Sequence, residues 1–254
     1  MLILLSPAKR LDDKMTPATD TYTQCELLDY TSELATELKK MDAEEVGALM
    51  KLSDKLADLN YDRYQKFNVP FTPDNARPAL YTFKGDVYDK MDVENYTEED
   101  LLFAQDHLRM LSGFYGLLRP LDLMQPYRLE MGTKLANKRG KNLYAFWGNA
   151  ITDEINKVDA DVIVNLASQE YFGAVKPEAL KGKLLTIHFK QHKNGAIKTI
   201  GMMAKRARGM MTDYIIKNRI IDVEQLKNFK EGGYTFQKDP STGSDWYFFM
   251  DMDN

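Results

Sequence analysis

Two short, uninterrupted apolar runs constrain the fold more than any other feature of the sequence. Residues 1–5 (MLILL) stop at Ser6 and Pro7, and residues 161–166 (DVIVNL) lead into a turn at Ser168. Runs of this length bounded by turn residues predict buried strands. The second run is typical of a strand whose carboxyl end faces a cleft. We therefore expect a sheet with polar side chains gathered at its strand ends.

Helical and hairpin signals fill most of the remaining chain. Two capping boxes, Asp42 with Glu45 and Thr97 with Asp100, predict helices that end near Leu52 and Gly113 respectively. Apolar periodicity predicts further helices within residues 25–40, 53–67, 143–158 and 203–219. A hairpin is expected around residues 194–195 (Asn-Gly), and a second between 234–237 and 246–250.

These elements mix without a regular βαβ rhythm, which favours an α+β or irregular, mixed α/β fold. The sequence contains no internal repeat and no linker long enough to divide it. We expect one domain over residues 1–254, with a central sheet surrounded by helices and a basic cleft.

Positive charge is concentrated in one segment of an acidic chain. The net charge is −4, yet residues 179–212 contain no Asp or Glu. That segment carries Lys181, Lys183, Lys190, Lys193, Lys198, Lys205, Arg206 and Arg208. Such segregation creates a local positive field that a net count conceals. It predicts a grip on DNA phosphates, and the alternative is a solvated basic face without a partner.

The predicted helix 203–219 is the best candidate for that grip. Lys205, Arg208 and Arg219 fall on one side of it, while Ala207 and Met211 can pack inward. Guanidinium groups offer phosphate a bidentate fork. Alternatively, these cations pair with acids from the first half of the chain.

A second candidate lies where two short helices meet at Ser53, Asp54 and Lys55, with Leu52 and Leu56 placed for burial. The pattern resembles a helix-hairpin-helix, which holds one DNA strand through backbone N–H groups at a helix N-terminus. The usual hairpin glycines are missing, and an ordinary helical corner is the alternative.

Arginines and tyrosines alternate in the third candidate, residues 107–132. Arg109 and Arg128 are suited to a cleft, where interleaved aromatic rings stack on bases or ribose. A buried ion-pair network is the alternative, and we favour that structural role for Asp122.

Signals for catalysis are weaker. Ser6 and Lys9 fit no nucleophile elbow, and neither a P-loop nor a dinucleotide fingerprint is present. His188 and His192 would diverge on a strand, with no carboxylate or cysteine close in sequence, so we expect neither metal nor other cofactor. Polar residues suited to a small-molecule cleft are Ser6, Lys84, Asp86, Asn165 and Ser168. They motivate the rival hypothesis of an enzyme acting on a small anionic or nucleotide-like substrate.

Cys25 is the only cysteine, which precludes an internal disulfide and fits a reducing compartment. The first apolar run is too short to cross a bilayer and lacks the flanks of a signal peptide. We expect a cytoplasmic protein without a membrane partner.

Several motifs in order along the chain resemble the YaaA family of bacterial peroxide-stress proteins. They are LILLSPAK, LSDKLA, FKGDVY, HLRMLSGFYGLLRPLDLMQPYRLEMG, YAFWG, VNLASQEYF and KRARGMM. The resemblance implies a single domain with a positively charged cleft and a helix-hairpin-helix, which maps best onto residues 53–55. It further implies binding to duplex, bubble or junction DNA and a link with recombinational repair. Proteins of this family are also linked with limiting free iron under hydrogen peroxide. The resemblance supplies no established catalytic residues.

We therefore expect a DNA-binding protein of the oxidative-stress response with little sequence preference, because no helix presents Asn, Gln and Arg together. Its expected DNA contacts are Lys205, Arg206, Arg208, Lys55, Ser53, Arg109, Arg128 and Lys9.

Overall fold

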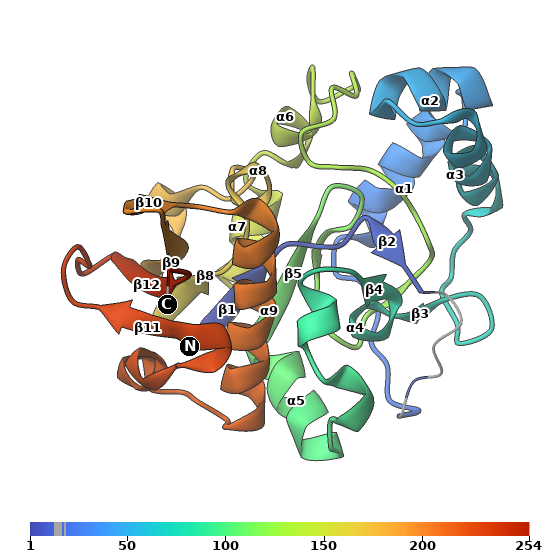
Figure 1. Cartoon of the computed structure of the whole chain (residues 1–254). Helices are drawn as coiled ribbons and strands as arrows, with labels where there is room; N and C mark the ends of the chain where they lie inside the picture. The colour runs from blue at the N-terminus through green and yellow to red at the C-terminus, as the bar shows by residue number, and fades with distance from the viewer. Residues whose placement is uncertain (13–16, 18, 254) are drawn as a thin grey trace.

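A mixed sheet organises the chain, and β1 (Leu2–Leu5) lies inside it (Figure 1). The computed structural model describes residues 1–12, 17 and 19–253. Over these residues, eight strands join in the order β11-β12-β9-β8-β1-β5-β6, with β10 paired to β9. The strands are β1, β5 (Leu108–Ser112), β6 (Gly116–Leu118), β8 (Val162–Asn165), β9 (Lys183–Lys193), β10 (Ala196–Lys198), β11 (Tyr234–Gln237) and β12 (Asp245–Asp251). Two-stranded ribbons pair β2 (Arg10–Leu11) with β4 (Phe83–Lys84) and β3 (Arg77–Pro78) with β7 (Leu123–Met124).

Helices lie on both sides of this sheet and extend away from it (Figure 1). The α-helices are α1 (Leu28–Leu38), α2 (Ala43–Met50), α3 (Asp54–Lys66), α4 (Ala79–Thr82), α5 (Glu98–His107), α6 (Leu143–Trp147), α7 (Ala150–Ile155), α8 (Gln169–Phe172) and α9 (Gly201–Lys217). The 3₁₀ turns are η1 (Tyr88–Lys90), η2 (Val93–Asn95), η3 (Pro177–Ala179), η4 (Val223–Asn228) and η5 (Glu231–Gly233). The expected mixed α/β single domain is confirmed.

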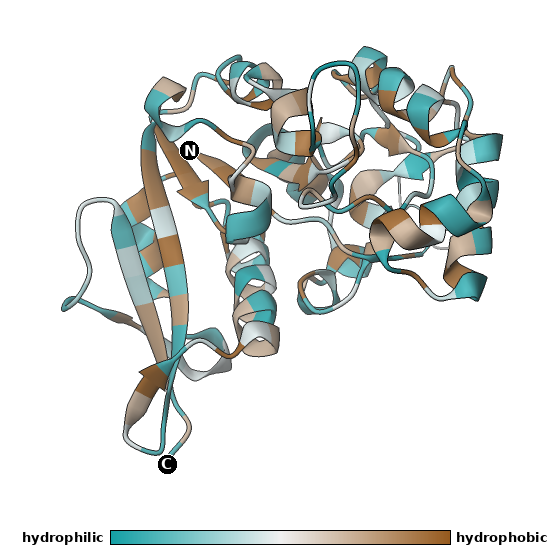
Figure 2. Cartoon of the chain, turned by 90° about the horizontal axis from the view of Figure 1, so that it is seen from above, coloured by the Kyte–Doolittle hydropathy of each residue, from teal (hydrophilic) through white to brown (hydrophobic). Residues whose placement is uncertain are grey.

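Burial on both faces explains the apolar strand sequences. All four residues of β1 have no exposed surface, and β1 runs parallel to β5 on one side and β8 on the other. Seen from above (Figure 2), hydrophobic stretches follow the strands beside α9, whereas α9 itself is mostly neutral to hydrophilic. Among the described residues, we find no helix with the length and hydrophobicity of a membrane span.

Local signals were reliable where a few neighbouring residues decide the structure. Both capping boxes form, and in α2 the Glu45 N–H donates to Asp42 Oδ1 while the Asp42 N–H donates to Glu45 Oε2, each at 2.9 Å. The hairpin at residues 194–195 is also confirmed, since Asn194 and Gly195 have φ of 53° and 69°. The terminal hairpin of β11 and β12 is antiparallel as expected.

Two expected helices are wrong in their extent. The helix that begins after Thr97 ends at His107, because Leu108–Ser112 instead pairs with β1 and β6. The helix expected over 143–158 is two short helices, α6 and α7, separated at Gly148 with a φ of 51°.

Helix α9 approaches η1 closely because Gly209 has no side chain. A Cβ built on Gly209 would lie 1.9 Å from the Val87 carbonyl oxygen. Gly209 therefore sets the distance between α9 and the backbone that precedes η1.

Replacing Gly209 with alanine should lower the free energy of unfolding by about 1–3 kcal/mol, because α9 must move off the Val87 carbonyl. Gly201→Ala is the matched control on the same helix, since a Cβ there meets nothing within 4 Å. That change should be neutral or should stabilise by up to about 1 kcal/mol. Urea denaturation measures both, and equal effects would contradict a tight contact.

Candidate functional site

The carboxyl ends of β1 and β8 meet at one edge of the sheet, because these neighbouring strands run parallel. Ser6 follows β1, and Ser168 follows β8 after a short turn. The Ser168 N–H donates to Ser6 Oγ at 2.8 Å, and the Ser6 hydroxyl donates to Ser168 Oγ at 3.3 Å. The Tyr88 hydroxyl donates to the Ser6 carbonyl at 2.9 Å. Because Ser168 Oγ is the acceptor in this bond, the O–H of Ser168 is available to donate to a further partner.

A cavity of about 220 Å³ lies beside these serines. Its walls come from the segment after β1, from β4 and the turn that follows, from the start of α8 and from one side of α9 (Figure 1). Five basic side chains line it, namely Lys9, Arg10, Lys84, Lys205 and Arg208. Only two acidic side chains, Asp86 and Glu170, share the lining, so the cavity carries an excess of positive charge.

Arg208 is the least satisfied of these cations. Its side chain is mostly buried, and its Nε has no hydrogen-bond partner among the described residues. No carboxylate of that part of the chain forms an ion pair with it, and burial lowers the pKa of its guanidinium. A buried donor without a partner is uncommon in folded proteins and costs stability.

The acids at the cavity are already occupied. Asp86 faces Arg206 on α9, with 3.7 Å between Oδ1 and Nε, and Glu170 Oε1 accepts from the Gly132 N–H at 3.0 Å. Arg206 lies outside the cavity lining, although Lys205 and Arg208 belong to it. The excess of positive charge in the cavity rests on its five basic side chains, which outnumber these two acids.

Glu130 forms ion pairs with two of the residues that were expected to contact DNA. Lys9 lies 2.5 Å from Glu130 Oε2, and Arg128 donates to Glu130 Oε1 at 2.8 Å. These cations lower the pKa of the Glu130 carboxyl despite its partial burial. Of the basic residues that line the cavity, Lys9 alone has a carboxylate partner among the described residues, which leaves Arg10, Lys84, Lys205 and Arg208 unpaired.

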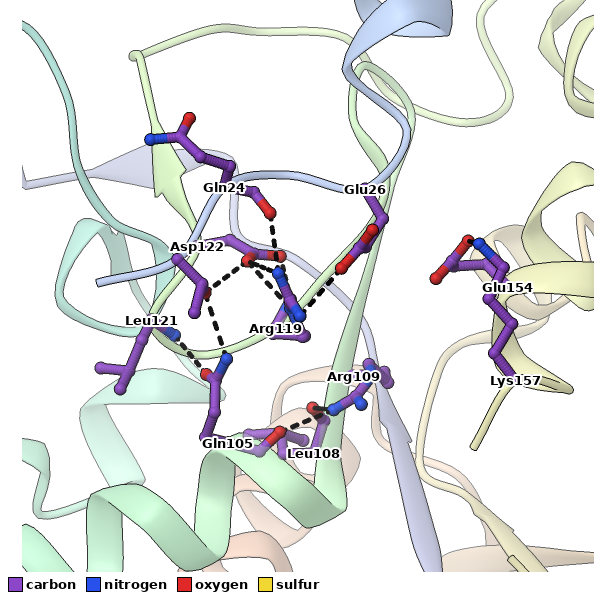
Figure 3. Close-up of polar contacts among 11 residues, drawn as sticks. Gln24, Glu26, Gln105, Leu108, Arg109, Arg119, Leu121, Asp122, Glu154 and Lys157 are labelled. Atoms are coloured by element: carbon purple, nitrogen blue, oxygen red, sulfur yellow. Dashed lines mark hydrogen bonds and ion pairs between the residues drawn. The ribbon is translucent and has the colours of Figure 1, made fainter. Parts of the chain in front are cut away.

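Arg109 lies on β5 and belongs to a different network (Figure 3). Its Nη1 donates to the carbonyls of Gln105 and Leu108, each at 2.8 Å, and burial lowers the pKa of the guanidinium. In the same region, Asp122 is 1% exposed and accepts hydrogen bonds from Arg119 and Thr23. These contacts fix the loop after β6, and neither Arg109 nor Asp122 lines the cavity.

Asn165 is the last residue of β8, but its side chain bonds to the turn that follows and not to the cavity residues. Its Oδ1 accepts from the Ala167 N–H at 2.9 Å, so it shapes the turn that delivers Ser168. Asn165 does not line the cavity.

The helices α2 and α3 form a hairpin away from α9 (Figure 1). Lys51 takes a left-handed conformation between them with φ 53°, and Ser53 caps α3 by position without a side-chain hydrogen bond. The expected burial of Leu56 is wrong, since it is 40% exposed. Helix α3 instead turns Ala57, together with Asn60 and Tyr64, toward the interior.

Arg219, expected beside Lys205 and Arg208, lies beyond the end of α9. It pairs with Glu99 at 2.9 Å and Asp100 at 3.1 Å, so it binds the end of α9 to the start of α5.

Carboxylates do approach the two strand histidines, contrary to expectation, because β12 pairs with β9. His188 Nε2 lies 2.7 Å from Asp245, and His192 lies 3.7 Å from Asp251 and 3.5 Å from Asp253. The His192 group has ligand atoms within 4.8 Å of one another, but Asp253 already accepts the N–H groups of the hairpin turn.

Cys25 is unsuited to sensing peroxide. The thiol is buried and donates to the Leu123 carbonyl at 3.0 Å. Burial raises the pKa of this thiol well above its usual value, so the reactive thiolate is scarce.

Comparison with known proteins identifies the family. The family model described as peroxide stress protein YaaA matches residues 1–240. The chain belongs to the YaaA family. A UPF0246 protein of Saccharophagus degradans is 55% identical over 253 residues, which cover 98% of each chain. The resemblance inferred from the sequence motifs is confirmed.

Among the cavity residues that sequence reasoning missed in this YaaA-family chain are Arg10 and Tyr171. Both adjoin residues that were singled out, since Arg10 follows Lys9 and Tyr171 comes shortly after Ser168. Both would have been predicted if every residue in the segments after β1 and β8 had been treated as a site candidate.

Replacing Arg208 with methionine should raise the free energy of unfolding by about 1–2 kcal/mol, because it removes a mostly buried charge that has no ion-pair partner in the described part of the chain and keeps an apolar stem. Arg119→Met is the contrasting variant, because the buried Asp122 carboxylate loses its ion pair with Arg119. That change should cost about 3–5 kcal/mol. Urea denaturation without added anions measures both, and similar losses would mean that Arg208 is structural.

Proposed function

We propose that this YaaA-family chain binds DNA as part of the peroxide-stress response, mainly through phosphate contacts and with little preference for sequence. The observation that carries the proposal is a set of cations around the cavity that form no ion pair within the described residues: Arg10, Lys84, Lys205 and Arg208. Clustered cations without acid partners attract polyanions, even in a chain whose net charge is −4.

Two lysines of the cavity lining are best suited to touch a duplex. Lys205 is exposed on α9, and Lys84 is half-buried on β4 across the cavity. A cavity of about 220 Å³ is far too small for a duplex, so backbone phosphates would rest on this rim. Contacts to phosphate alone carry no sequence information.

The hairpin of α2 and α3 is our proposed second contact. Lys55 is exposed in the first turn of α3, where the N–H groups of Asp54 and Lys55 have no acceptor among the described residues. Two separated contacts would favour bubbles or junctions, whose bent strands can reach both surfaces.

A second candidate function is an enzyme or receptor for a small anionic, nucleotide-like molecule. The serine hydroxyls and the buried guanidinium favour it, because gripping a backbone at the surface requires neither.

Lys205→Gln should weaken duplex binding about threefold to tenfold and lower the slope of log affinity against log salt by about one. Lys181→Gln is the matched control, because Lys181 is also exposed in the acid-free segment but precedes β9 at the opposite edge of the sheet. Fluorescence anisotropy at several salt concentrations measures both. Equal slopes for Lys205→Gln and the unchanged chain would exclude the α9 rim as a phosphate contact.

Lys55→Glu should weaken binding to a four-way junction about fivefold or more, through charge repulsion at the start of α3. Lys66→Glu alters the other end of the same helix, where Lys66 lies 3.8 Å from Asp62, and should change affinity less than twofold. The same anisotropy assay compares them. If both variants lost affinity equally, general charge rather than the hairpin would explain the effect.

A further inference from the structure

We propose that the cavity beside Ser6 and Ser168 is a binding site for a single phosphomonoester group, with Arg208 as its buried anchor. The site goes beyond DNA backbone binding and does not depend on it, because a free phosphorylated molecule would satisfy the same groups. The ligand class is an organic phosphate with two negative charges.

The donors at the cavity match a phosphate group in kind. Arg208 lines the cavity, and a guanidinium offers a fork that binds two oxygens of one phosphate. The Ser168 hydroxyl retains its hydrogen, because its oxygen accepts from Ser6. These donors come from different elements, α9 and the segment before α8, and both line the same cavity.

The charge around the cavity favours a dianion over a monoanion. Besides Arg208, the lining includes Arg10, Lys84 and Lys205 without carboxylate partners in the described part of the chain. A phosphomonoester carries close to two negative charges at neutral pH. An internal phosphodiester carries one, and its two sugar substituents hinder entry to a deep donor.

The remaining lining suits the carbon skeleton that bears the phosphate. Pro7, Val87 and the ring of Tyr171 add apolar surface to the same cavity. Its volume of about 220 Å³ is below the usual range for drug-sized ligands, so it accommodates the phosphate and the atoms next to it.

Titration calorimetry with three adenosine compounds isolates the phosphate chemistry. Adenosine 5′-monophosphate is a monoester, the 3′,5′-cyclic monophosphate is a diester with the same base and sugar, and adenosine lacks phosphate. We expect the monoester to bind at least about tenfold more tightly than the cyclic diester, and adenosine not to bind. Equal affinities for the monoester and the cyclic diester, or no binding of the monoester, would overturn the proposal.

Variants connect that preference to the cavity. Arg208→Lys keeps the charge but loses the fork, and should weaken monoester binding at least about tenfold. Ser168→Ala should weaken it about fivefold or more through the lost hydroxyl, and tests the site independently of how Arg208 variants fold. Lys181→Gln is the control, because Lys181 is an exposed cation that precedes β9 and does not line the cavity. Unchanged affinity in both cavity variants would refute the assignment.

Duplexes with 5′-phosphate or 5′-hydroxyl ends distinguish the source of the phosphate. A preference for the phosphorylated end that Arg208→Lys abolishes identifies a DNA strand end, whereas monoester binding without an end preference identifies a small molecule. Both results support the site. Monoester binding without any duplex binding would refute the DNA proposal alone, and duplex binding without monoester binding would refute this inference alone.

Discussion

The main-chain pairing of β1 with β5 on one side and β8 on the other is the constraint on which the rest of the structure depends. Because β1 has no exposed surface, its peptide groups need hydrogen-bond partners inside the protein. Neighbouring parallel strands supply them, and the register places Leu4 beside Asn165. The same register brings Ser6 to Ser168, so the core pairing also builds one wall of the cavity.

Sequence reasoning succeeded where local chemistry decides the structure. Capping at Asp42 and Thr97 and the turn at Asn194 each depend on a few neighbouring residues. It failed at Leu108–Ser112, whose apolar spacing continues the helical pattern. Pairing with β1 makes this segment a strand, and no local signal reveals a partner so distant in the sequence.

The candidate site, like the fold, was predicted in part from the sequence. Polar residues after two buried strands predicted that Ser6 and Ser168 belong to the edge of the sheet where a cleft forms. Helical periodicity placed Lys205 and Arg208 on one face, but it could not separate an exposed lysine from a buried arginine. The segment around Val87 packs against α9 at Gly209, next to Arg208, and the sequence gives no sign of this distant contact. The acids near His192 were equally hidden, because β12 brings them from the end of the chain.

The contact between Gly209 and the Val87 carbonyl has a consequence for how any ligand enters. It locks two walls of the cavity together, since Val87 lines one wall and Arg208, next to Gly209, lines another. A receptor shaped in advance loses little conformational entropy when it is filled. Association would then need no movement of these two walls against each other, and their fixed spacing would contribute to selectivity.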